Sequence, residues 1–323
     1  MGQVYVRNGS PSLKDKKTKS VNIHIGVFFD GTSNNFYNTD YRKKNPNKKY
    51  NDKGFNLYDS YRGDYTNVAK LYNTYFTQGH DFKIYIEGPG TVSPLCKLDE
   101  SGNEVYYSIG AADSLASAAS GNWIESMGSK IRKANNIITK RLADKYPPNT
   151  IVNIKMDVFG FSRGAAEARR FISPQNIVPL LYEEFGTALN NYRISINFLG
   201  LFDTVLSEYS ILSGIELKLQ SDIKKVVHLV AANEYREHFP VTSIKEKGKK
   251  LRSNYIEIVL PGAHSDIGGG YNQDAVDYLY YFNTNTHVKE WEKWPSTYDL
   301  TDENSIKFGS VLKSSCKPIL LSA

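Results

Sequence analysis

Cysteine is nearly absent from the 323-residue sequence, which contains only Cys96 and Cys316. Neither cysteine belongs to a CxxC pair or to a Cys/His spacing typical of metal ligands, so a structural zinc site is not expected. So few cysteines also exclude the small secreted scaffolds that depend on several disulfides. We therefore expect a fold that is stabilised by a hydrophobic core rather than by cross-links.

Long apolar runs are missing as well. No stretch is long and apolar enough to span a bilayer. The N-terminal sequence MGQVYVRNGSPSLKDKK contains no apolar run of the length found in signal peptides. We therefore predict a protein that is made in the cytoplasm without a signal peptide, and we expect any action elsewhere to depend on another export route.

Acidic residues are slightly outnumbered, because 40 Lys and Arg against 34 Asp and Glu give a net charge of +6. The excess is clumped in the runs KDKK (14–17), RKKNPNKK (42–49) and KEKGKK (245–250). Such runs are usually solvated loops, and an anionic membrane surface or nucleic acid is the alternative. No nucleic-acid motif accompanies them and aromatic residues are not interleaved with them, so no nucleic-acid partner is expected.

Strand-like and helix-like segments alternate along the chain. Runs of β-branched and aromatic residues predict strands, at 21–29, 81–88, 151–159, 195–203 and 254–260. Apolar residues at helical spacing predict helices, at 66–76, 123–145, from 165 onward, and 221–238. This alternation predicts an α/β fold with a mostly parallel central sheet and helices on both faces. In such sheets the active site lies beyond the carboxyl ends of the strands.

The predicted domain organisation has three parts. Residues 1–20 form a polar N-terminal arm, residues 21–275 the catalytic domain, and residues 276–323 a C-terminal extension. Two segments are predicted insertions. Segment 36–62 is too long for a plain connection, and segment 92–121 is rich in Gly, Ser and Ala, as a lid over a pocket would be.

The motif Gly160-Phe161-Ser162-Arg163-Gly164 stands where a predicted strand becomes a helix. A G-x-S-x-G sequence in that context is typical of a nucleophile elbow, a sharp turn that exposes a reactive serine. The turn strains the serine backbone and brings strand and helix close together, which explains the small residues Gly160 and Gly164. The alternative is a glycine-rich turn in which the serine only caps the helix.

A serine nucleophile requires a base, and the base requires an orienting carboxylate. Four histidines follow Ser162 in the sequence: His228, His238, His264 and His287. His264 lies in the loop PGAHSDIGGGY directly after a predicted strand and is the expected base. His228 falls inside a predicted helix and His287 beyond the last clear element, while His238 remains an alternative.

Asp203 is the expected orienting carboxylate, because it ends a strand and lies between Ser162 and His264 in chain order. Asp266 is the rival, but it follows His264 by only two residues and is expected to organise the adjacent glycine turn. The three aspartates Asp30, Asp203 and Asp266 are a conceivable set of ligands for a structural cation, which nothing else in the sequence indicates. The expected chemistry needs no metal and no cofactor.

An oxyanion hole requires two backbone N–H donors. The amide of Arg163, the residue after the nucleophile, is the expected first donor. The turn after the first strand, Asp30-Gly31-Thr32, is expected to supply the second through Gly31 or Thr32, with Asp30 in support. The alternative is an ordinary Asx turn at this position.

Five motifs occur in an order that resembles a known family: FFDGTSNN, GFSRGAAEAR, LGLFDTV, HLVAANEYREHFP and PGAHSDIGGGY. They resemble the catalytic domain of the type VI secretion phospholipase effectors, an α/β-hydrolase family, from about residue 21 to 275. By motif, the resemblance implies Ser162 as nucleophile, His264 as base and Asp203 as orienting acid.

The resemblance also implies a function and partners. It implies a phospholipase A-type lipase that cleaves acyl esters of membrane phospholipids, is delivered into the periplasm of rival bacteria, and has an immunity protein and a secretion-spike protein as partners. Larger members add a C-terminal membrane-docking region, and only a short segment follows the GGGY motif here. Membrane contact is then expected from the Tyr-rich insertions and the basic runs.

Three other interpretations remain open on the sequence. The same chemistry can act on another lipid or on a carbohydrate ester, since the sequence does not define the acyl pocket. The chain can be an interaction module without catalysis, or a binder of nucleic acid or anionic surfaces that relies on its net positive charge.

Overall fold

The structure, a computed structural model, describes residues 20–46, 59–93, 95–98, 104–108, 123–147, 150–173, 192–206, 217–219, 222–234, 239–246, 248–271, 276–282 and 289–295. The chain divides into two compact units, one that ends at Gly270 and one that begins at Tyr271. Outside the described residues lie His238, His287, the predicted arm up to residue 19, and most of the insertion 92–121.

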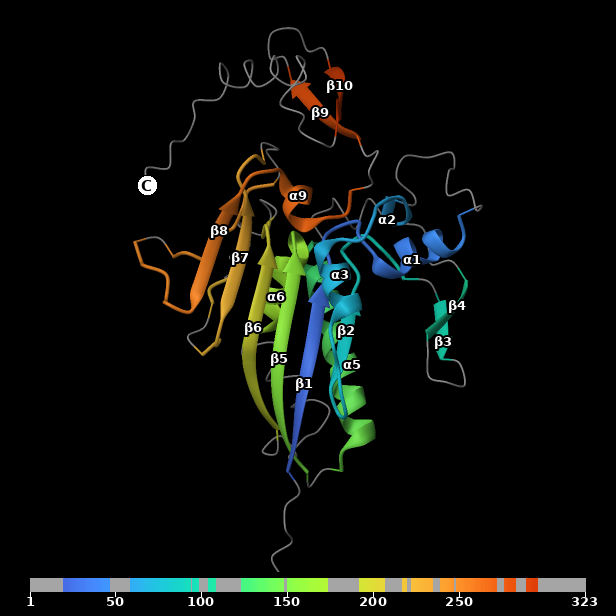
Figure 1. Cartoon of the computed structure of the whole chain (residues 1–323), viewed down its shortest axis with the longest axis vertical. Coiled ribbons are helices and arrows are strands. Elements are labelled where there is room, and N and C mark those ends of the chain that lie inside the picture. The colour runs from blue at the N-terminus through green and yellow to red at the C-terminus, as the bar shows by residue number, and fades with distance from the viewer. Residues whose placement is uncertain are drawn as a thin grey trace, which may run out of the picture. The chain divides into compact units, whose positions relative to one another are not determined.

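Six parallel strands form the central sheet of the first unit, in the order β2-β1-β5-β6-β7-β8. Figure 1 shows their arrowheads at one end of the sheet. The strands are β1 (Ser20–Phe29), β2 (Phe82–Ile86), β5 (Ile151–Phe161), β6 (Tyr192–Phe202), β7 (Val226–Ala231) and β8 (Tyr255–Leu260). The predicted parallel sheet is confirmed.

Helices cover both faces of the sheet, as predicted. They are α3 (Asn67–Thr74), α5 (Trp123–Lys145) and α6 (Arg163–Phe171). Successive side chains of a strand point to opposite faces. In β1, Val27 packs into the larger core cluster, which contains residues of α5 and α6, whereas Phe28 packs with Val68 and Ala69 of α3. The two clusters therefore lie on opposite sides of β1.

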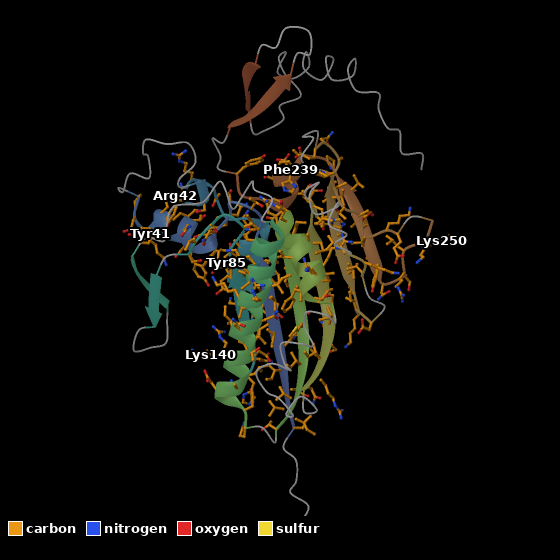
Figure 2. The ribbon with its side chains drawn as sticks, turned by 180° about the vertical axis from the view of Figure 1, so that it is seen from behind. Tyr41, Arg42, Tyr85, Lys140, Phe239 and Lys250 are labelled. Carbon is orange, nitrogen blue, oxygen red and sulfur yellow. The ribbon has the colours of Figure 1, made fainter. Side chains whose placement is uncertain are left out.

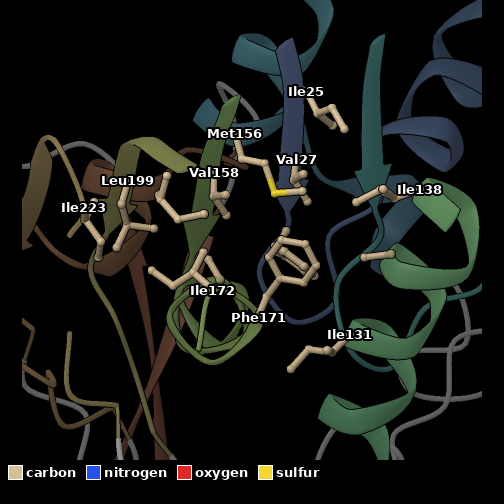
Figure 3. Packing of buried hydrophobic residues seen from close by; sticks show 14 of the residues in the cluster. Ile25, Val27, Ile131, Ile138, Met156, Val158, Phe171, Ile172, Leu199 and Ile223 are labelled. Carbon is tan, nitrogen blue, oxygen red and sulfur yellow. The ribbon is translucent and has the colours of Figure 1, made fainter. Parts of the chain in front are cut away.

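The larger core cluster is aliphatic and fully buried at its centre. Figure 3 shows strand side chains such as Val158 and Leu199 facing Phe171 and Ile172 at the end of α6, with Ile138 of α5 nearby. Burial of this many apolar side chains is the main stabilising contribution to the fold. It fixes the carboxyl ends of the strands, which carry the candidate site.

The prediction of a helix over 221–238 is wrong. Residues 226–231 form strand β7, which pairs with β6 on one side and with β8 on the other. The pair Val226-Val227 and Val230 favour an extended backbone, and residues of β7 alternate between buried and half-buried. The flanking Lys, Ala, Glu and Arg residues favour a helix locally. Pairing with the two neighbouring strands outweighs that local preference.

The described parts of the insertions have some regular structure. Segment 36–62 contains α1 (Phe36–Lys44) and α2 (Asp59–Arg62), and α1 starts where the Asn35 side chain accepts hydrogen bonds from two backbone amides. Segment 92–121 contains the antiparallel pair β3 (Leu95–Leu98) and β4 (Glu104–Ser108).

In the described residues of the second unit, β9 (Val276–Phe282) and β10 (Lys289–Pro295) form an antiparallel strand pair. Across both units, none of the helices in the described residues has the length and apolar character needed to cross a bilayer.

Candidate active site

Four candidate residues follow the carboxyl ends of four strands. Asp30 follows β1, Ser162 follows β5 and Asp203 follows β6, while His264 opens the short helix α9 (His264–Gly268) shortly after β8. The four side chains are buried, with relative exposures of 1% to 4%. Parallel strands therefore bring residues that are distant in sequence to one edge of the sheet, where sites of α/β proteins lie.

Ser162 has the backbone strain expected of a nucleophile elbow. Its φ of 57° and ψ of −127° lie in a region that non-glycine residues rarely adopt. The turn is held at both ends, because the Ser162 amide donates to Phe202 O at 3.0 Å and Ser162 O accepts from the Ala165 amide at 3.0 Å. Helix α6 starts directly after the serine, so its positive end lies at the hydroxyl.

The two glycines of the motif are required by close packing. A Cβ at Gly160 would approach Ala165 Cα within 2.5 Å, and a Cβ at Gly164 would approach Asp30 O within 2.3 Å. Both distances are too short for any side chain. The predicted steric reason for the glycines is therefore present: α6 packs directly against the end of β1.

His264 and Asp203 form a buried pair. His264 Nδ1 lies 2.6 Å from Asp203 Oδ2, and the second carboxylate oxygen accepts the Ala231 amide at 2.9 Å. Asp266 has another role, because its carboxylate accepts the Ala263 amide at 2.7 Å at the start of α9. Of the two candidate carboxylates, Asp203 is the one that contacts His264.

Two aromatic rings hold the imidazole. The ring centroid of Phe161 lies 4.7 Å from that of His264, and Phe239 makes an edge contact at 5.1 Å. Figure 2 labels Phe239 near the strand ends. Phe161 directly precedes Ser162, so the motif itself contacts the candidate base. No hydrogen bond joins Ser162 Oγ to His264 within the described residues, which is common for such pairs before substrate binds.

The turn after β1 lies against Ser162. A Cβ at Gly31 would be 3.2 Å from Ser162 Cβ. Most amides of this turn already have acceptors: Gly31 N–H donates to Asp30 Oδ1 at 2.7 Å, and the amides of Ser33 and Asn34 donate to backbone oxygens. Among the described residues none accepts the Thr32 amide. Thr32 is therefore a better candidate oxyanion donor than Gly31.

The Asp30 carboxylate stabilises this turn through hydrogen bonds. Its carboxylate accepts hydrogen bonds from the Gly31 amide, from Thr66 Oγ1 at 2.9 Å and from the Tyr85 hydroxyl. Burial raises the pKa of Asp30 to about 6, although the three hydrogen bonds oppose that rise. Asp30 therefore supports the conformation of the turn rather than facing a substrate.

The Arg163 side chain joins the elbow to the same turn, since its Nε donates to Thr32 Oγ1. Burial lowers the pKa of Arg163 to about 10, while the charge of Glu167 opposes that fall. Glu167 is completely buried one turn later in α6, and its two carboxylate oxygens have no hydrogen-bond partner among the described residues. Burial raises the pKa of Glu167 well above its ordinary value.

The site also contains residues that the sequence did not reveal. His228 is fully buried in β7 and contacts both Glu257 and the Thr204 amide, one residue from Asp203. The erroneous helix prediction concealed this position. Separately, no group of three or more His, Cys, Asp or Glu side chains converges as a metal site in the part of the chain that the structure describes.

Comparison with known proteins adds an independent observation. The family model "T6SS, Phospholipase effector Tle1-like, catalytic domain" matches residues 180–291, a range that contains Asp203 and His264 but not Ser162. The chain resembles the Tle1-like effectors of type VI secretion. This confirms the resemblance that the five motifs predicted. No curated protein matches the chain by sequence.

A solved structure shares the α/β fold of this chain. The Tle1 effector bound to the VgrG spike of the type 6 secretion system is 22% identical, with a TM-score of 0.50 over 97% of this chain. The present chain spans 65% of the length of that Tle1 chain. An uncharacterised protein from Pseudomonas aeruginosa is 21% identical with a TM-score of 0.43, and the match covers 79% of this chain and 42% of that one.

Proposed function

We propose that the chain is a serine lipase of the phospholipase A type, with Ser162, His264 and Asp203 as its catalytic residues. The observation that carries the proposal is the buried His264–Asp203 pair, 2.6 Å apart, which packs against Phe161, the residue before a strained serine. A serine hydroxyl becomes nucleophilic when an oriented imidazole accepts its proton. The likeness to a phospholipase effector family supports a lipid ester as the substrate.

The proposed reaction has two steps. Ser162 Oγ attacks the acyl carbonyl while His264 Nε2 accepts the hydroxyl proton, and Asp203 holds the Nδ1–H and stabilises the imidazolium. The amides of Arg163 and Thr32 stabilise the oxyanion. His264 then gives the proton to the departing alcohol, which leaves as the lysolipid. In the second step water, activated by His264, releases the fatty acid from Ser162.

The setting of this activity belongs to the same proposal. The Tle1 effector in the solved complex is bound to a VgrG spike. By analogy, a spike protein carries this chain out of the producing cell into the periplasm of a target cell. The membrane phospholipid surface is then the substrate, and an immunity protein protects the producer.

Fatty-acid release from mixed phospholipid vesicles is the direct test, comparing wild type with folded Ser162→Ala. We expect release by wild type and its loss in the variant, and the lysolipid product identifies the acyl position that is cut. Release that persists in Ser162→Ala would disprove the proposed nucleophile.

A fluorophosphonate probe separates the chemistry from the substrate. A wild type that reacts with the probe at Ser162 but leaves vesicles intact is a serine hydrolase that acts on a different ester. A wild type that does neither is an interaction module, and the catalytic proposal is then wrong.

A further inference from the structure

Asp203 is held in an unfavourable backbone conformation. Its φ is 39°, in the left-handed region that favours glycine. Strain of this kind persists only where surrounding contacts maintain it. Part of the restraint is direct, since the Asp203 amide donates to Leu229 O at 2.7 Å and its carboxylate accepts the Ala231 amide. The next peptide unit, at Thr204, is restrained by a side chain.

That side chain is His228, which is fully buried in β7. His228 Nε2 lies 3.1 Å from the Thr204 amide, and Nδ1 lies 2.9 Å from Glu257 Oε2. An amide N–H can only donate, so Nε2 must accept and carry no proton. Nδ1 then carries the hydrogen, and the Nδ1–H donates a hydrogen bond to the Glu257 carboxylate. The contacts thus define one neutral tautomer with both ring nitrogens engaged.

Glu257 is in turn fixed by other groups. Its carboxylate accepts hydrogen bonds from Ser243 Oγ at 2.7 Å and from the Ile244 amide at 2.8 Å. Although burial opposes it, the hydrogen bonds from His228, Ser243 and Ile244 lower the pKa of Glu257 to about 2. The acceptor for the His228 Nδ1–H is therefore a firmly held carboxylate.

A second connection reaches the same residue, Thr204. The Thr242 amide donates to Thr204 O at 2.7 Å, and Thr242 lies next to Ser243. Arg169 donates to Thr242 O at 2.8 Å, so a hydrogen bond also connects α6 to this segment. The N–H and the C=O of Thr204 are thus both held by a network that converges on Glu257.

We infer that His228, oriented by Glu257, is a positioning residue that holds the Asp203–Thr204 turn so that Asp203 meets the His264 imidazole. The inference rests on the proposed serine chemistry. His228 does not touch the reacting atoms, so its removal lowers the rate of the chemical step and leaves substrate binding unchanged. Groups around a catalytic pair that fix its orientation commonly contribute about 10- to 100-fold.

Two substitutions of similar polarity separate the roles of the two ring nitrogens. In His228→Gln the amide oxygen reaches the place of Nε2 and still accepts the Thr204 amide. In His228→Asn the shorter amide reaches only the place of Nδ1, so it meets Glu257 and leaves Thr204 without its acceptor. The rate constant for fluorophosphonate labelling of Ser162, measured per folded molecule, reports the nucleophile without any choice of lipid.

We expect His228→Gln to label within about threefold of wild type and His228→Asn to label about 10- to 100-fold more slowly. On any ester that wild type hydrolyses, kcat should fall in His228→Asn with KM unchanged. Equal labelling of folded His228→Asn and wild type would overturn the inference. An unreactive wild type would instead disprove the proposed function, so the two failures are distinct.

Glu257 provides the same comparison if the His228 variants do not fold. Glu257→Gln keeps an acceptor for the Nδ1–H, whereas Glu257→Leu removes it and frees the imidazole to turn. We expect Glu257→Gln to retain most of the labelling rate and Glu257→Leu to lose about 10-fold or more. Equal rates in these two variants would also contradict the positioning role.

Discussion

The carboxylate of Asp203 uses one oxygen for His264 and the other for the Ala231 amide. Asp203→Asn keeps the size of the side chain. Its NH₂ group, however, must face one of the two N–H donors, which belong to His264 and Ala231. We expect Asp203→Asn to lower kcat by about 10³- to 10⁴-fold, because the imidazole loses both its orientation and its counter-charge.

Ester hydrolysis by the two purified proteins tests this expectation. Asp144→Asn is the matched control, because Asp144 is exposed on α5 and should leave the rate within about twofold of wild type. A loss of less than about 10-fold in Asp203→Asn would indicate that another acid orients His264.

Glu167 makes stability depend on pH. Its pKa is raised above the ordinary 4.5, chiefly by burial, so the folded protein keeps a proton that the unfolded chain loses. Wild-type stability therefore falls as pH rises above about 4.5, and the loss ends at the raised folded pKa. Glu167→Gln cannot ionise. Its free energy of unfolding relative to wild type should rise by about 1.4 kcal/mol per pH unit across that window.

Urea unfolding at pH 4.5 and pH 7.5 measures this difference, and Glu87→Gln is the control of opposite sign. Lys130 and Lys133 outweigh burial and lower the pKa of Glu87 to about 2. Its stabilising contribution is present above pH 4.5 and lost as pH falls through about 2. Glu87→Gln should thus destabilise at pH 7.5. The prediction would be contradicted if the free energy of unfolding of Glu167→Gln, relative to wild type, did not rise from pH 4.5 to pH 7.5.

At the scale of elements, the contact between α6 and β1 tolerates no methyl group at Gly164. An added Cβ would lie 2.3 Å from Asp30 O and 2.5 Å from Phe29 O, and neither backbone atom can move freely. We expect Gly164→Ala to lower the free energy of unfolding by about 1–3 kcal/mol and to displace the elbow.

Gly128→Ala in α5 is the matched control, because the nearest atom is the end of the flexible Arg132 side chain at 3.3 Å. Alanine in a helix interior should stabilise by up to about 1 kcal/mol there. Thermal unfolding of both variants gives the comparison, and equal melting temperatures would mean that α6 can move away from β1.

The sequence predicts the elements that have strong local signals. Buried runs such as 21–29 identify strands by composition, and the join at Ser162 identifies the elbow. Chain order then selects Asp203 and His264. The strand β7 was not predictable in this way, because its pairing with β6 and β8 decides its conformation and only Val226, Val227 and Val230 hint at it.

The supporting contacts of the site are the least predictable part. Asp30 looks like an ordinary turn residue in sequence, and only the fold brings Thr66 and Tyr85 to its carboxylate. His228 was placed in the wrong element, so its position behind Asp203 could not be foreseen. Both cases depend on residues that meet only through the sheet.

At the scale of the whole molecule, the positive charge of the basic runs is partly compensated by nearby carboxylates, which the net charge of +6 already includes. Two described lysines of the run 42–49 have acidic partners: Lys43 with Asp64 at 2.5 Å and Lys44 with Asp40 at 2.7 Å. In the run 245–250, Lys249 pairs with Glu246 at 2.6 Å. These lysines contribute less to long-range attraction than the sequence alone indicates.

Binding to vesicles that contain phosphatidylglycerol should therefore weaken by less than about 10-fold between 50 and 200 mM NaCl. Co-sedimentation measures it, with neutral phosphatidylcholine vesicles as the control. A loss of about 10³-fold or more, as for proteins that neutralise many phosphates, would mean that the lysines of these runs leave their acidic partners and bind lipid phosphates.

The large sequence separation between residues that meet in the fold has a kinetic consequence. Strand β1 pairs with β5, so Ser20 lies opposite Ile151. The residues of the proposed triad are also far apart in sequence, from Ser162 to His264. Contacts between segments so distant in sequence form slowly. About 100 residues separate Ser162 from His264, which at about 5–20 residues per second corresponds to roughly 5–20 s of translation. A ribosome-bound chain thus carries the proposed nucleophile for seconds before the proposed base is synthesised, and we expect it to be inactive throughout that interval.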